Sequence, residues 1–179
     1  MADSHGAQSP PDSHGDGAEA AMSLPGSQAE TSPERQALEL TLLHRVRAAI
    51  ALDTEFANVF RTVVEQVSAT FGYRLVSVYT LEDGELVLQH QVGYDTVLDR
   101  IAADQGVIGR VATTGQPMLV RDVSREPAFL AAIPGIGSEI CVPFFREGGV
   151  AGVFNVESDT ADPLAAEAFH LIAGVTGFL

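Results

Sequence analysis

Two alternating segments within residues 106–157 constrain the fold of this chain more than any other feature. Residues 138–145 (SEICVPFF) and 150–157 (VAGVFNVE) each alternate between apolar and polar or small side chains, and a glycine-containing joint separates them. A period of two is typical of a β-strand with one buried face, and glycine suits the tight turn of a hairpin. The stretch therefore predicts two neighbouring strands of an antiparallel sheet.

One face of these two strands is predicted to carry Glu139, Cys141, Asn155 and Glu157, because alternate residues of a strand point to the same side. The opposite face is apolar. The long, loop-rich segment at 94–137 lies between the predicted hairpins, and we expect it to close over the polar face. A polar face covered in this way predicts a pocket.

The remaining segments complete an α+β fold. Residues 75–81 and 85–92 form a second hairpin around an Asp-Gly turn, and residues 54–71 and 163–179 have helical spacing of apolar residues. We expect one central antiparallel sheet of five to six strands. Its more apolar face, to which every long strand contributes, is covered by the two helices, and the crossover at 94–137 covers the other face.

The N-terminal third has a different composition. Residues 1–31 are rich in Ala, Gly, Ser, Pro and Asp, so they are predicted to be a disordered acidic tail. Residues 32–52 are predicted to form a helix with an unusually broad apolar band. Such a helix is interpreted as a dimerisation or signalling element, and the alternative is a helix packed on its own domain. The folded domain is expected at 53–179.

Charge and composition limit the partners. The net charge is −14, and all ten basic residues are arginine. An acidic chain without a basic patch does not favour nucleic acid or an anionic membrane as a partner. The single cysteine fits a reducing compartment, and neither a signal peptide nor a membrane-spanning run is evident. We therefore expect a cytoplasmic protein.

Five short motifs of this chain resemble those of GAF domains. They are GVIG at 106–109, GQP at 115–117, VRDV at 120–123, SEICVP at 138–143 and GVFNVE at 152–157. The resemblance runs from about Thr54 to the C-terminus and implies a PAS-like sensory domain that binds a small molecule. It also implies that flanking helices relay the signal to an output domain in a longer chain, either a diguanylate cyclase (GGDEF) or a histidine kinase. The apolar helix at the C-terminal end fits such a continuation.

Nine residues are predicted to contact the ligand. They are Tyr79, Arg110, Arg121, Phe129, Ile133, Glu139, Cys141, Asn155 and Glu157. The aromatic and aliphatic members would form apolar walls. The two arginines would bind an anionic group of the ligand, or pair instead with Asp122 and Glu126.

Two alternatives to a sensor remain open. The chain is similar to free-methionine sulfoxide reductases, in which acids at the positions of Glu139, Asn155 and Glu157 hold the substrate amine. That resemblance suggests a redox enzyme using Cys141, although the family's cysteines in the crossover are absent from residues 106–137. A dimerisation module without a ligand is the second alternative. We expect no enzymatic activity from this segment.

No cofactor or metal is predicted. Glu126 stands where haem-binding GAF domains carry a histidine, and the crossover lacks the cysteine that attaches a bilin. The cyclic-nucleotide signature of the family needs a lysine, which the sequence lacks. There is no Cys/His cluster typical of a zinc site.

Overall fold

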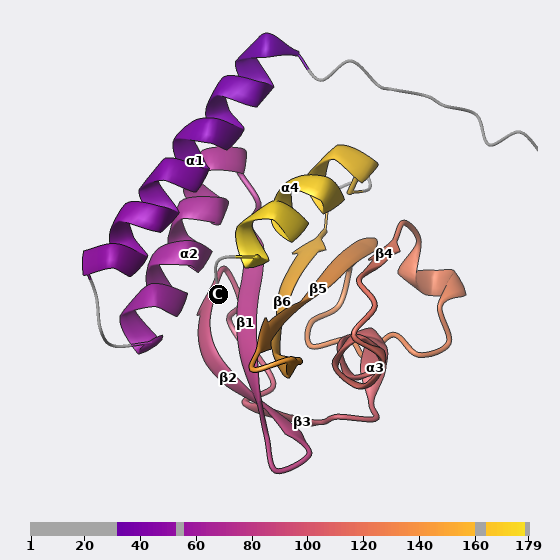
Figure 1. The fold of residues 1–179 in the computed structure, drawn as a ribbon. Helices are drawn as coiled ribbons and strands as arrows, with labels where there is room; N and C mark the ends of the chain where they lie inside the picture. The colour runs from indigo at the N-terminus through magenta and orange to yellow at the C-terminus, as the bar shows by residue number, and fades with distance from the viewer. Residues whose placement is uncertain (1–31, 53–55, 160–163, 178–179) are drawn as a thin grey trace, which may run out of the picture. The chain divides into compact units, whose positions relative to one another are not determined.

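A computed structural model describes residues 32–52, 56–159 and 164–177, which form a six-stranded sheet with helices on both faces (Figure 1). In chain order the elements are α1 (Pro33–Leu52), α2 (Phe56–Phe71), β1 (Leu75–Glu82), β2 (Glu85–Val92), β3 (Arg100–Ala102), α3 (Gly106–Thr114), β4 (Met118–Val120), the 3-10 turn η1 (Val123–Arg125), β5 (Ser138–Arg146), β6 (Gly149–Ser158) and α4 (Ala166–Thr176). None of the described helices is both long and apolar enough to cross a membrane.

The sheet has the strand order β3-β2-β1-β6-β5-β4, and every neighbouring pair is antiparallel. This confirms the predicted α+β fold with five to six strands. The two edge strands, β3 and β4, are each only three residues long. β4 pairs with Glu139–Cys141 alone, so Pro143 lies in the part of β5 beyond that pairing.

Both hairpins turn through two residues in the left-handed region. Asp83 and Gly84 have φ values of 49° and 85°, and Glu147 and Gly148 have φ values of 53° and 83°. Positive φ at both central positions matches the right-handed twist of the flanking strands, and Asp-Gly is a strong signal for such a turn. These turns therefore follow directly from the local sequence.

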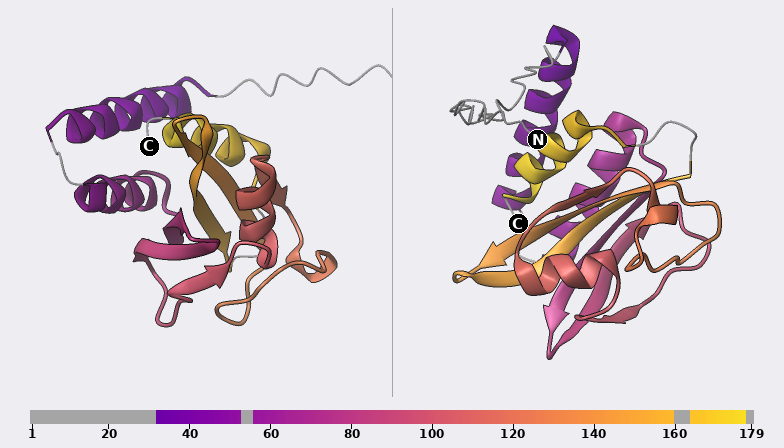
Figure 2. Two further views of the ribbon diagram at one scale, coloured as in Figure 1. Left: turned by 60° about the horizontal axis from the view of Figure 1, so that its bottom comes forward. Right: turned by 90° about the vertical axis from the view of Figure 1, so that its right-hand side faces the viewer.

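Helices α1, α2 and α4 lie over one face of the sheet, as both views of Figure 2 show. Beneath them is an apolar core drawn from the strands and all three helices. Its fully buried members include Leu42, Val64, Val76, Phe154 and Ile172. The core shows that α1 packs on its own domain at Leu42, while Leu38 and Leu40 of the same helix are exposed.

A second apolar cluster occupies the opposite face, under α3. Leu86 and Leu88 of β2 belong to it, so the prediction that the apolar residues of every long strand lie under the helices is wrong for β2. The reason is that α3 presents its own apolar residues, such as Val107 and Val111, to this face. They need apolar partners on the sheet.

Several predicted boundaries differ from the observed ones. α4 begins at Ala166, three residues after the predicted start, and its N-cap residue, Ala165, makes no side-chain capping bond. β3 lies in a segment predicted to be irregular. The predicted disordered tail at 1–31 lies outside the described residues.

Candidate ligand-binding pocket

A small pocket lies between the sheet and the crossover, on the face away from α1, α2 and α4. Strands β1, β5 and β6 form its floor. Its roof is formed by residues 94–108 and by residues 130–132. The lining residues are Ser77, Tyr79, Tyr94, Val97, Leu98, Ile101, Val107, Ile108, Leu130, Ala132, Glu139, Asn155 and Glu157.

The floor is built by strand register. Glu139 of β5 is the register partner of Glu157 of β6, and Asn155 of β6 is the partner of Ser77 in β1. Partners in antiparallel strands point to the same face, which brings the four polar side chains together. All four are buried: both glutamates are 4% exposed.

Four polar atoms at this site have no hydrogen-bond partner in the described part of the chain. They are Glu139 Oε2, Glu157 Oε2, the Ser77 hydroxyl and the Tyr94 hydroxyl. An unpaired buried polar atom costs about 1–3 kcal/mol. Such a group of atoms around a pocket would be stabilised by a polar guest.

Burial changes the acidity of both carboxyls. Burial is the largest cause that raises the pKa of Glu139 to about 8, and the negative charge of the neighbouring Glu157 contributes to the same rise. A hydrogen bond with the Cys141 thiol partly offsets this rise. Burial also raises the pKa of Glu157, and the nearby Tyr94 hydroxyl offsets part of this change without a well-formed hydrogen bond. Glu139 is therefore mainly protonated at neutral pH when the pocket is closed.

The pocket is closed in this structure. Its volume is about 20 Å³, which is room for about one water molecule. Pockets for small organic ligands are usually of order 300 Å³ or more. The sequence predicts a chamber at this place, and the structure has room there for about one water molecule, so the roof must move before the space can admit a ligand.

Tyr79, Glu139, Asn155 and Glu157 line the pocket, as the strand alternation predicts. Cys141 lies beside it, fully buried, with its Sγ atom 3.3 Å from Glu139 Oε1 and 3.2 Å from Asn155 Oδ1. Five of the nine predicted residues are therefore brought together on one face of the sheet.

The other four predicted residues do not line the pocket. Arg110 lies on the outer side of α3, where Nη2 is 3.4 Å from Glu126 Oε1, so it makes the pairing considered as an alternative to ligand binding. Arg121 is exposed at the end of β4. Phe129 packs against the second apolar cluster, and Ile133 is half-buried.

Several lining residues were missed. Ser77 shares the face of Tyr79 by simple alternation, so the sequence contained a usable signal for it. Tyr94, Leu98, Leu130 and Ala132 come from irregular segments, in which no periodicity indicates where a side chain points.

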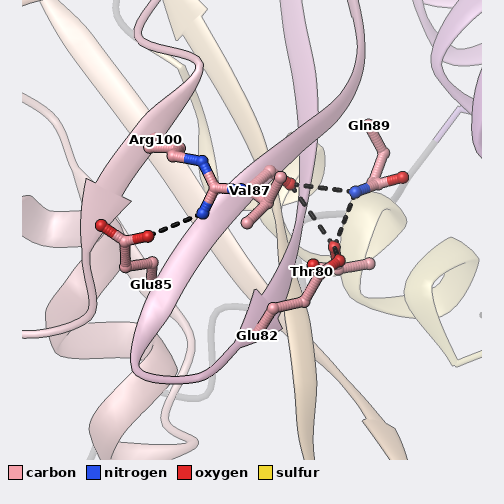
Figure 3. Close-up of polar contacts among 6 residues, drawn as sticks. All are labelled: Thr80, Glu82, Glu85, Val87, Gln89 and Arg100. Carbon is pink, nitrogen blue, oxygen red and sulfur yellow. Dashed lines mark hydrogen bonds and ion pairs between the residues drawn. The ribbon is translucent and has the colours of Figure 1, made fainter.

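One side of the roof is firmly anchored. The Tyr79 hydroxyl donates to Leu98 O at 3.1 Å, and the Gln91 side chain bonds both the N–H and the C=O of Tyr94. An ion pair of 2.7 Å joins Arg100 of β3 to Glu85 of β2 (Figure 3). Residues 94–102 are thus held to the sheet by several bonds.

The environment of Cys141 does not activate it. Burial raises the pKa of its thiol well above the usual range, and the neighbouring Glu139 raises it further. A reactive cysteine needs the thiolate, which a nearby cation favours and which burial disfavours. Among the described residues, no three His, Cys, Asp or Glu side chains gather closely enough to hold a metal ion.

Curated relatives match only part of this chain. GAF domain-containing protein A of Dictyostelium discoideum is 32% identical over 104 residues, which cover 58% of this chain and 63% of that protein. The Nif-specific regulatory protein of Herbaspirillum seropedicae is 29% identical over 98 residues, which cover 52% of this chain and 18% of that protein. The chain thus spans less than two thirds of the length of either relative.

Among solved structures, free methionine-R-sulfoxide reductase from Neisseria meningitidis, in complex with its substrate, has a TM-score of 0.75 to this chain. The match covers 83% of this chain and 89% of the reductase at 23% identity, so it shows a common fold. The family model of the GAF domain matches residues 55–177, which is more than half of the sequence. The chain therefore belongs to the GAF domain family.

Proposed function

We propose that this chain is a sensory GAF domain that binds a small molecule carrying a protonated amino group. The observation that carries the proposal is the pair of buried carboxyls, Glu139 and Glu157, each with an oxygen that lacks a partner beside a pocket. Among the residues that the structure describes, no basic side chain lines the pocket to neutralise them. A cationic N–H donor would satisfy both the charge and the hydrogen-bonding capacity of the pair.

The side chains around the two carboxyls restrict the size and polarity of the rest of the ligand. Val97, Leu98, Ile101, Val107 and Ile108 provide apolar walls, so a compact molecule with an apolar portion fits best. The resemblance to free-methionine sulfoxide reductases supports the placement of an amine here, because acids at the positions of Glu139 and Glu157 hold the substrate amine in those enzymes. Asn155 replaces one acid of that set, which lowers the negative charge of the site.

The signal would pass through α1 and α4. Ser138, beside Glu139 in β5, accepts a hydrogen bond of 2.9 Å from the Leu164 backbone, just before α4. Ligand binding at Glu139 would therefore bias the position of α4, and α1 packs against α4. The bias is limited to the difference in ligand affinity between two states, of order 1–3 kcal/mol.

The signal would reach a regulatory output. The similarity to a Nif-specific regulatory protein favours a regulatory role in a longer chain. A diguanylate cyclase or histidine kinase as the output domain, a homodimer and a cytoplasmic location all stay predictions.

A redox enzyme based on Cys141 is disfavoured, because the only thiol of the chain is fully buried and burial raises its pKa well above the usual range. The structural likeness to sulfoxide reductases rests on fold, so it does not extend to their chemistry.

Native mass spectrometry of the purified protein, followed by a thermal-shift screen of small amines, tests the proposal. A ligand at 100 times its Kd stabilises the folded state by about 2.7 kcal/mol, which raises the Tm of a domain of this size by about 5–10 °C. Glu157→Ala should abolish the shift, whereas Glu147→Ala, in an exposed turn, should keep it. If a binder is found and both variants retain the full shift, the amine site is not at Glu157.

A further inference from the structure

The pocket leaves two acidic groups with little exposure to water and with no basic side chain in its described lining. Glu139 and Glu157 are register partners on adjacent strands, both are almost fully buried, and the space beside them holds about one water molecule. Two carboxylates so placed repel each other, and burial penalises each negative charge. The closed arrangement is therefore compatible with protonated carboxyls and strained by ionised ones.

The other titratable groups near the pair do not relieve this strain. Glu157 and Cys141 face Glu139 from the sheet, and Glu126 acts on it from the segment after η1. Around Glu157 lie the hydroxyls of Tyr79 and Tyr94, and Asp99 acts on Tyr79. Arg110 forms an ion pair with Glu126 and does not line the pocket.

The two parts of the pocket roof are held in place by different numbers of hydrogen bonds. Residues 94–102 are anchored by Tyr79, Gln91 and the pair of Arg100 with Glu85, as described above. Residues 128–136, here called the strap, contribute Leu130 and Ala132 to the cover, and Leu130 is 38% exposed. At its start, Ala128 and Phe129 bond to Glu126, and Gly137 bonds to Ser158 just beyond its end. Apart from the packing of Phe129 and Ile136 against the second apolar cluster, the strap is held by few hydrogen bonds. It is therefore the part of the roof that can move with the fewest hydrogen bonds broken.

We propose that proton loss from the facing Glu139 and Glu157 carboxyls opens the pocket by displacing the strap, so that the site is gated by pH. Ionised carboxyls need water or a cation, and lifting the strap admits either one. The same step prepares the site for an ammonium group, which binds ionised carboxyls and not protonated ones. This inference concerns regulation of the site assigned above, and it rests on the proposed function for its biological consequence.

The direction of the pH effect follows from the raised pKa values of the two carboxyls. A buried carboxyl whose pKa is raised to about 8 retains its proton in the closed state over a range in which the open or unfolded state has lost it. The stabilisation of the closed state is complete below the ordinary carboxyl pKa of about 4.5 and is lost as the pH rises towards 8. Opening is thus favoured on the alkaline side.

Hydrogen exchange of the ligand-free protein between pH 6 and pH 9 tests the proposal, after correction for the intrinsic pH dependence of exchange. We expect the protection of the two hydrogen-bonded strap amides, those of Ala128 and Phe129, to fall at least tenfold, since each pKa unit between closed and open states contributes a factor of ten. Protection within β1 and β6 should change much less. In the same samples, the carboxyl carbon-13 signals of Glu139 and Glu157 should titrate at the pH where strap protection is lost.

Substitutions of the two carboxyls identify which of them causes the pH dependence of the strap. Glu139→Gln and Glu157→Gln each remove one ionisation at nearly constant shape, so each should flatten the pH dependence of the strap. Glu147→Gln removes a charge from the exposed β5–β6 turn and should leave the wild-type profile unchanged.

Constant strap protection in the wild type, or carboxyl titration at a different pH from the loss of protection, overturns the inference even if a variant does not fold. Both measurements use ligand-free protein. Such a result would leave the proposed function standing, because that function is tested by amine binding at one fixed pH.

Discussion

Gly152 in β6 marks a place where the sheet leaves no room for any side chain. A Cβ atom built there would lie 2.1 Å from Tyr79 O and 2.3 Å from the Phe144 ring. Both distances are far shorter than a van der Waals contact, and Tyr79 belongs to the pocket floor. The absence of a side chain at this position is therefore a steric requirement for packing β6 between β1 and β5.

We predict that Gly152→Ala lowers the free energy of unfolding by about 1–3 kcal/mol or more, the usual range for overpacking a core. Gly174→Ala is the matched control, because a Cβ atom in that exposed turn of α4 meets nothing within 4 Å. It should raise stability by about 0.5–1 kcal/mol, since alanine favours helix over glycine. Urea unfolding of both variants measures the difference, and equal effects would refute the steric argument.

Between β5 and the segment entering α4, one buried hydroxyl adds a hydrogen bond to the apolar packing of Leu164. Ser138 is fully buried and accepts the 2.9 Å bond from Leu164 N–H. Ser138→Ala would leave that backbone donor unpaired. We predict a loss of about 1–3 kcal/mol in the free energy of unfolding.

The control for this prediction is Ser124→Ala, because the Ser124 hydroxyl bonds Asp122 at an exposed site and water can replace it. Its effect should stay within about 0.5 kcal/mol. Hydrogen exchange should also locate the loss from Ser138→Ala mainly in α4. A uniform loss over the whole sheet would argue against a local anchor.

The sequence predicts an element well when residues close to it in the chain determine its structure. The hairpin at Asp83 and Gly84 and the alternation through Glu139 and Glu157 are set by neighbouring residues, so both were predictable. The edge strand β3 was not, because three residues carry no periodicity and its ion pair at Arg100 reaches across to β2. Tertiary contacts determine whether such short segments form strands.

The same distinction applies to the candidate site. Floor residues follow from strand alternation, whereas the direction of Arg110 depends on how α3 is rotated above the sheet. That rotation is fixed by the burial of Val107, Ile108 and Val111, so the arginine turns outward to Glu126. The small volume of the pocket depends on side chains of the crossover and had no signal in the sequence.

On the surface of the domain, α1 exposes large apolar side chains to water. Leu38 is 46% exposed and Leu40 is 59% exposed, although Leu42 of the same helix is completely buried. Exposed leucines on a helix that also packs against α2 and α4 favour the predicted association of two copies.

We predict that the double variant Leu38→Gln, Leu40→Gln weakens self-association at least tenfold, which corresponds to about 1.4 kcal/mol of lost apolar burial. Sedimentation over a range of concentrations measures the dissociation constant. Thr41→Gln, at a polar exposed position of α1, is the control and should leave it unchanged. A wild-type protein that is monomeric at high concentration would exclude the dimer.

The short edge strands of the sheet also affect how the domain behaves at high protein concentration. With only three residues in β3 and three in β4, little regular backbone is offered for recruitment by a stray strand from another molecule. Where β5 extends past its short neighbour, Pro143 lacks the N–H group that an incoming strand would need. The domain should therefore resist fibrillar aggregation even when its concentration is high.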